Sequence, residues 1–240
     1  MKKVLYLLLF MVVVLAGCAK VNVDPLTLHE YFQNTKDAYT ESDSGRVTVA
    51  ITDEEGNLDY DYIYLNNETT IEEMQLLLTE GNSVIKAYVK DANAYIDVDG
   101  QKTYAPLASE AGENILAGYW FSDLTAPVFN MFDKSIFNAL EINESIKGEA
   151  KLTWNKDNYT FIDDNYTPDE FIEADIRFGE VKENIKSIAV EIKYANELIT
   201  SLESTWTNND NEVTTIRIEF HGTGTHEISF PADLNSYTER

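Results

Sequence analysis

Apolar and polar residues alternate one by one over much of this chain. From Tyr60 to Tyr64, for example, tyrosines recur at every second position. Successive side chains of a β-strand point to opposite faces of a sheet, so a period of two places one set of residues on a buried face. Short turns rich in Gly, Asn and Asp separate the alternating stretches, as is typical of antiparallel hairpins. The pattern recurs at 47–51, 58–64, 74–78, 85–89, 94–98, 150–154, 159–161, 188–194, 198–206, 216–220 and 228–230.

These stretches predict about ten antiparallel strands, a number at which one sheet tends to curl or split. Between the two sets of strands lies a segment, 107–142, in which apolar residues recur every three to five positions. That spacing indicates helices, and Gly118 and Pro127 should divide them into shorter pieces. Asp24 followed by Pro25 predicts the start of an earlier helix. No convincing linker interrupts the chain, so we expect one α+β domain over 25–240 with a helical insert at 107–142.

The N-terminal residues have the order of a secretory signal. Lys2 and Lys3 precede an unbroken apolar run from Val4 to Leu15, and the small residues that follow lead to Cys18. The run is too short to remain in a bilayer as a spanning helix. The ending Leu-Ala-Gly-Cys resembles the lipobox of bacterial lipoproteins, which implies cleavage before Cys18 and acylation of its thiol. We therefore expect a signal peptide over 1–17, a lipidated tether over 18–24 and a location outside the cytoplasm.

The composition excludes several classes of function. The formal net charge is −24, and it becomes more negative by two if Lys2 and Lys3 leave with the signal peptide. Such an acidic chain offers no basic stripe for nucleic acid, and anionic lipid surfaces should repel the folded domain. Contact with the membrane is therefore expected through the acyl groups on Cys18. Cys18 is also the only cysteine, so no disulfide within the chain is available.

The sequence carries none of the common catalytic or metal-binding motifs. The chain has no Gly-x-Ser-x-Gly, no phosphate-binding Gly loop and no His-Glu-x-x-His. His221 and His226 flank a turn but lack a firm third ligand for zinc. Asp99-Gly100 fits a hairpin turn better than a calcium loop. We expect neither an enzyme, nor a bound metal, nor a cofactor.

The order of elements resembles a known group of carrier proteins. The last strands, read from Thr215 to Phe220 and from Ile228 to Asp233 with Gly222 and Gly224 between them, are similar to the end of the LolA/LolB and LppX/LprG group of lipoprotein and lipid carriers. The resemblance covers most of the chain after Cys18, in pattern and order without a sharp motif. It implies a single strongly curved antiparallel sheet, an open half-barrel, whose concave face is covered by the helical insert. In that group the cavity holds acyl chains or whole lipids.

Two functions stay open at this point. The aromatic residues of the insert and the sheet could line a cavity for an apolar ligand, or they could simply fill the core. In the first case the chain is a carrier of a lipid or acyl chain, and in the second it is a scaffold or sensor that binds another envelope protein. The candidate lining residues are Tyr60, Tyr62, Tyr64, Leu76, Trp120, Phe121, Phe129 and Phe132.

Overall fold

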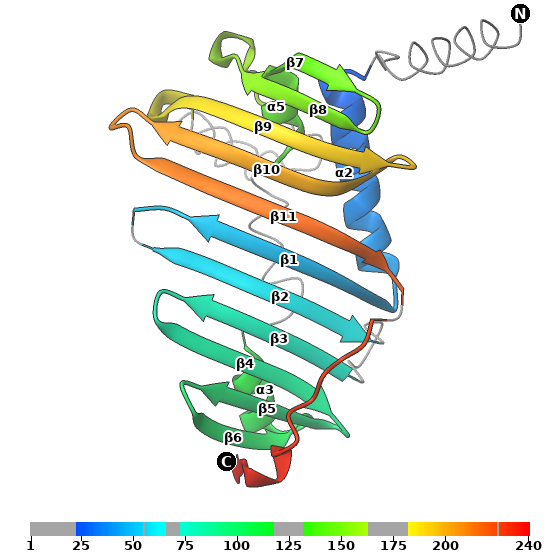
Figure 1. Cartoon of the computed structure of the whole chain (residues 1–240), viewed down its shortest axis with the longest axis vertical. Helices are drawn as coiled ribbons and strands as arrows, with labels where there is room; N and C mark the ends of the chain where they lie inside the picture. Colours follow the sequence, from blue (N-terminus) through cyan, green and yellow to red (C-terminus); the bar gives the residue numbers. More distant parts are fainter. Residues whose placement is uncertain (1–22, 55, 66–72, 118–131, 163–181, 225) are drawn as a thin grey trace, which may run out of the picture.

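The computed structural model describes residues 23–54, 56–65, 73–117, 132–162, 182–224 and 226–240. Their arrangement is shown in Figure 1. The helices are α2 Pro25–Glu41, α3 Glu110–Leu116 and α5 Lys134–Ala139. The strands are β1 Ser44–Thr52, β2 Asn57–Leu65, β3 Glu73–Glu80, β4 Ser83–Lys90, β5 Asn93–Val98, β6 Gln101–Pro106, β7 Leu140–Ile146, β8 Glu149–Trp154, β9 Ile185–Ala195, β10 Leu198–Asn208, β11 Val213–Thr223 and β12 Thr238–Glu239. None of the described helices is long and apolar enough to cross a membrane.

All the described strands belong to one open sheet, in the order β12-β6-β5-β4-β3-β2-β1-β11-β10-β9-β8-β7. Two antiparallel meanders, β1 to β6 and β7 to β11, are joined where β1 pairs with β11. Only two residues of β12 pair with β6, and they run parallel to it. The predicted fold class, a single antiparallel sheet with helices, is confirmed. The sheet has twelve strands, where the sequence predicted about ten.

The difference between the predicted and the observed number of strands has local causes. β6 lacks the apolar alternation of a predicted strand, but it pairs with β5 through a tight hairpin. Asp99 and Gly100 form the turn of this hairpin, and both adopt the positive φ angles that it requires. β7 begins at Leu140, inside the segment predicted to be helical, and pairs with β8. Residues 159–161 and 228–230, both predicted as strands, form no strand.

The helix α2 begins as the sequence predicts. The carboxylate of Asp24 accepts a hydrogen bond from the backbone N–H of Thr27 at 2.8 Å, and Pro25 occupies the first turn. Its buried residues, Leu28, Phe32, Thr35 and Tyr39, follow helical spacing and face the sheet. Thr35 also accepts a hydrogen bond from the N–H of Ile199 at 2.8 Å, which ties α2 to β10.

The predicted helical insert contains two described helices. Ser109 caps α3 by accepting a hydrogen bond from the N–H of Gly112, and Asp133 caps α5 in the same way through Ile136. The insert was expected to end at residue 142, but α5 ends at Ala139, where β7 follows directly. Residues 118–131 of the insert lie outside the described residues.

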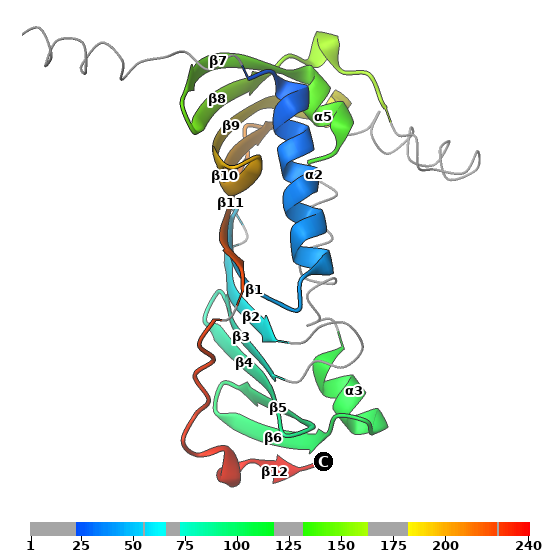
Figure 2. The same ribbon diagram turned by 90° about the vertical axis from the view of Figure 1, so that its right-hand side faces the viewer.

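The helices α2, α3 and α5 all lie on the same face of the sheet, which we call the helix-side face (Figure 2). The C-terminal segment, residues 226–240, crosses the opposite, outer face. There the N–H of Ser229 donates to Gln75 at 2.9 Å, and the ring of Phe230 lies under the ammonium of Lys90 at 4.5 Å. Residues 228–230 are therefore held by outer-face side chains and do not extend the sheet. One hydrophobic core runs along the helix-side face beneath the helices.

Candidate ligand-binding face

The central strands present a continuous apolar surface on the helix-side face. The three tyrosines of β2 point to this face because they are two residues apart. Strand register places Tyr62 between Val47 and Leu76. We call the following set the apolar strip of β1 to β4: Val47, Val49, Tyr60, Tyr62, Leu76, Leu78, Ile85 and Ala87.

The predicted lining residues Tyr60, Tyr62, Tyr64 and Leu76 thus lie on neighbouring strands and are all buried. Leu76 lies directly opposite Tyr62 in the β2–β3 pair, and the rings of Tyr62 and Tyr64 are 5.9 Å apart. Burial raises the pKa of Tyr60 above its ordinary value, because the phenolate would lose its hydration. The phenol therefore stays uncharged even in mildly alkaline solution, and Tyr60 adds no charge to the apolar surface.

Tyr64 has a structural role that sequence reasoning missed. Its hydroxyl donates to the carbonyl oxygen of Tyr39 at 2.7 Å, near the end of α2. The hydroxyl of Tyr39 in turn donates to the carbonyl of Arg46 and accepts from the N–H of Gly222 at 2.7 Å. Burial raises the pKa of Tyr39 to about 12. These bonds fasten α2 to β1, β2 and β11, so Tyr64 holds the helix in place beside the strip.

Phe132 lies elsewhere on the helix-side face. It is fully buried, and its ring meets those of Phe32 and Trp206 edge to face, at 5.9 and 6.1 Å. It therefore belongs to the packing between α2 and β10. The other candidates, Trp120, Phe121, Phe129 and the lipidation residue Cys18, lie outside the described residues.

The described helices support the two ends of the sheet. α2 packs mainly on β10, with α5 beside it, whereas α3 packs on β5 and β6. Figure 2 shows α2 and α3 at different heights on the same face. The apolar strip of β1 to β4 lies between these two supports, as the strand order requires.

A hollow of about 240 Å³ lies beside α3 on this face. Its described lining comes from β5, β6, α3 and the last residue of the chain: Ile96, Val98, Gln101, Thr103, Asn114, Ile115, Ala117 and Arg240. The alternation in 94–98 indicated that Ile96 and Val98 share a face. No sequence signal indicated that Arg240 would reach the same place, because it follows a polar tail without a motif.

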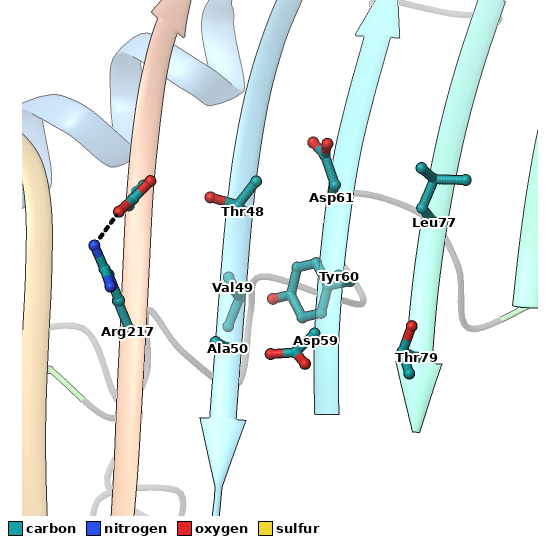
Figure 3. A pocket seen from close by; sticks show the side chains of 10 residues that line it. Thr48, Val49, Ala50, Asp59, Tyr60, Asp61, Leu77, Thr79 and Arg217 are labelled. Atoms are coloured by element: carbon teal, nitrogen blue, oxygen red, sulfur yellow. Dashed lines mark hydrogen bonds and ion pairs between the residues drawn. The ribbon is translucent and has the colours of Figure 1, made fainter. Parts of the chain in front are cut away.

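The outer face is polar where the helix-side face is apolar. A shallow groove of about 360 Å³ crosses β11, β1, β2 and β3 on this face. Figure 3 shows the side chains that line it, with Asp59, Asp61 and Arg217 among them. Arg46 donates two hydrogen bonds to Asp61, at 2.8 and 2.9 Å, and Arg217 pairs with Glu219 at 2.6 Å. Such a charged surface does not suit an apolar ligand. Within the described ranges, no group of three or more His, Cys, Asp or Glu residues is placed to hold a metal ion.

Comparison with known proteins gives structural neighbours only. No family model matches the chain, and no curated protein matches its sequence. A crystal structure of a LolA superfamily protein from Nitrosomonas europaea is 12% identical, with 87% of this chain and 96% of that chain covered and a TM-score of 0.25. A crystal structure of an outer membrane lipoprotein-sorting protein domain from Vibrio parahaemolyticus is 8% identical, with 87% of this chain and 97% of that chain covered and a TM-score of 0.22.

Proposed function

We propose that this chain is a lipid-anchored bacterial lipoprotein, located outside the cytoplasm, that binds or carries an apolar ligand such as a lipid or an acyl chain. The observation that supports this proposal most is the apolar strip of β1 to β4, which lies between the supports of α2 and α3. Ligand pockets are lined mainly by apolar and aromatic side chains of this kind. The proposed protein is not an enzyme and needs no cofactor.

The anchor is proposed from the sequence before the described residues. Lys2, Lys3 and the apolar run lead to Cys18, whose thiol would carry the acyl groups. Two acyl chains give stable attachment to a membrane where one chain gives only marginal binding. An anionic membrane surface would repel the acidic domain, so the lipidated tether alone would hold the domain near the membrane.

The expected affinity follows from the burial of the alkyl chain. Each methylene removed from water contributes about 0.8 kcal/mol. About fifteen buried carbons would contribute about 12 kcal/mol, and an association cost of about 4 kcal/mol would then leave micromolar binding. The strip would contact the chain, and we propose Trp120, Phe121 and Phe129 as further contacts from the insert, with Phe132 supporting them from the core.

A titration with a fluorescent long-chain fatty-acid probe tests the proposal. The wild-type chain should bind the probe saturably at micromolar concentration. Leu78→Gln should weaken binding about tenfold, since an amide buried without a partner costs about 1–3 kcal/mol. Leu77→Gln is the matched control, because Leu77 is the next residue of β3, is 37% exposed and points to the outer face.

Far-UV circular dichroism and thermal unfolding would show that both variants fold. Trp120→Glu, in the insert, is a second variant. It should abolish binding of the probe while the strands remain folded. Absence of saturable binding to the wild-type chain would contradict the carrier proposal.

A non-enzymatic scaffold that binds another envelope protein is the alternative. The observation that favours it is the packing of Phe132 against Phe32 and Trp206, because this part of the helix-side face is filled by its own side chains. A scaffold of this kind would bind no fatty-acid probe, so the same titration separates the two functions.

A further inference from the structure

The hollow beside α3 combines an apolar floor with one cation. Ile96 and Val98 of β5 and Ile115 of α3 supply its apolar side chains. Gln101, Thr103 and Asn114 are its neutral polar lining residues, and Arg240 is the one described lining residue with a cationic side chain. A volume of about 240 Å³ is smaller than the pocket of a whole drug-sized ligand, so it suits one end of a longer molecule.

Arg240 reaches the hollow because the C-terminal segment turns around the edge of the sheet. Figure 2 shows the segment descending the outer face, turning through β12 at the edge and ending on the side of α3. Lys102 forms an ion pair with Asp233, and the ring of Tyr237 meets that of Tyr95 edge to face at 5.5 Å. The N–H of Arg240 then donates to the carbonyl of Tyr104 at 2.9 Å. The fold therefore holds the backbone of Arg240 against β6.

The charge of Arg240 is available to a ligand. Among the described residues, Arg46 and Arg217 are paired with carboxylates on the outer face, whereas no ion pair involves Arg240. None of the described residues that line the hollow is acidic. In a chain with a net charge of −24, the hollow thus has one cationic side chain and no acidic side chain among its described lining residues. A guanidinium group can donate two parallel hydrogen bonds to a carboxylate or a phosphate.

A row of neighbouring apolar side chains leads from the hollow to the apolar strip. Strand register places Val98 opposite Ile85, Ile85 opposite Leu78, and Leu78 opposite Tyr60. This row crosses three strand spacings, about 14 Å, from the hollow to the centre of the sheet. Val98 and Ile85 are half-buried, and Leu78 and Tyr60 are buried. An acyl chain whose polar end lies at Arg240 would therefore run into progressively more buried apolar surface.

We infer that this hollow binds the anionic head group, a carboxylate or a phosphate, of an acyl lipid whose chain lies along the row from Val98 to Tyr60. This inference rests on the proposed function, because it names the class of ligand that the apolar strip takes. Arg240 selects acyl ligands with a negative charge over neutral ones of the same chain length.

Competition against the fluorescent fatty-acid probe tests the inference on the purified full-length chain. The competitors are hexadecanoate, hexadecanol of equal chain length, a lysophospholipid with a free phosphate monoester, and butanoate. The variants are Arg240→Gln and Arg240→Lys, with Arg217→Gln as the matched control for loss of an arginine on the outer face. The leader is common to all variants, so its own affinity for the probe cancels in the comparison.

The wild-type chain and Arg217→Gln should prefer hexadecanoate to hexadecanol by about fivefold to tenfold, as expected for a partly desolvated charge-assisted bond. Arg240→Gln should lose this preference and keep its affinity for hexadecanol, and Arg240→Lys should keep part of the preference. A stronger response to the phosphate monoester than to hexadecanoate would assign the site to phospholipid head groups, and the reverse to free fatty acids.

Equal binding of acid and alcohol by the wild-type chain, or an unchanged preference in Arg240→Gln, would overturn the inference and leave the carrier function standing. Competition by butanoate as strong as that of hexadecanoate would also overturn it, because the ligand would then need no acyl chain. Failure of every long-chain compound to compete would instead refute the proposed function itself.

Discussion

At the scale of single residues, the tyrosines of β2 divide into two roles. Tyr64 is fastened through its hydroxyl to the backbone at the end of α2, and so its polar atom is satisfied within the fold. Tyr60 and Tyr62 belong to the apolar strip, and their buried rings make up part of its apolar surface. Replacement of Tyr64 should therefore disturb the helix position, whereas replacement of Tyr60 should change the surface of the strip.

The lipid anchor depends on a single sulfur atom. Cys18→Ser should leave the precursor unacylated and uncleaved, because the thiol is the proposed acyl acceptor. Ala19→Ser, at the next position, keeps the thiol and serves as the matched control. Intact mass and partitioning into detergent check both variants. If Cys18→Ser is still acylated, or is still cleaved before residue 18, the proposal that Cys18 carries the lipid anchor is contradicted.

Some residue roles could be predicted from the sequence and others could not. Asp24 as a helix cap was predictable, because capping depends on residues only three positions apart. The position of Arg240 could not be predicted. It depends on the pairing of β12 with β6, which lies more than a hundred residues earlier in the chain. The bond from Gly222 to Tyr39 is also a contact of distant segments that no local pattern reveals.

At the scale of elements, α3 depends on a close approach between its backbone and the end of β6. A Cβ atom on Gly112 would lie 2.2 Å from the carbonyl oxygen of Pro106, well inside any real contact. Only glycine allows this approach, although it is a poor helix former. The same contact helps to set the distance between α3 and β5, and therefore the shape of the hollow.

Gly112→Ala should accordingly destabilise the protein by about 1–3 kcal/mol, because the helix must shift to relieve the overlap. Glu113→Ala, at an exposed position of the same helix, should be neutral within about 0.5 kcal/mol. Urea unfolding of both variants measures the difference. Equal stability of Gly112→Ala and the wild type would contradict the tight packing of α3.

Elements with strong local patterns were predictable. The alternation in β1 to β5 and β9 to β11 fixes the residues that face the core, and the Asp-Gly turn fixes the hairpin before β6. β7 could not be separated from the helix before it, because Leu140 lies four residues after Ile136 and so continues the helical spacing. Residues 228–230 alternate like a strand, but Gln75 and Lys90 offer them an outer-face site, and the pattern alone could not show this.

At the scale of the whole molecule, the two faces of the sheet differ in chemistry. The helix-side face carries the hydrophobic core, of which the apolar strip is a part, and the outer face carries paired charges such as Arg46 with Asp61. An apolar ligand is therefore expected only on the helix-side face. The N-terminal end of α2 and the helix α3 lie toward opposite ends of the sheet (Figure 2).

Native mass spectrometry of the mature protein, purified from its own membranes, tests most directly the claim that this face binds an apolar ligand. The account predicts a mass above that of the acylated protein by one lipid, which is lost on denaturation because it is not covalent. The acyl groups on Cys18 remain after denaturation, so the two kinds of lipid are distinguished in one experiment. The same preparation of Leu77→Gln should retain the extra mass, and Leu78→Gln should lose it. A spectrum that shows only the acylated protein, native and denatured alike, would contradict the account.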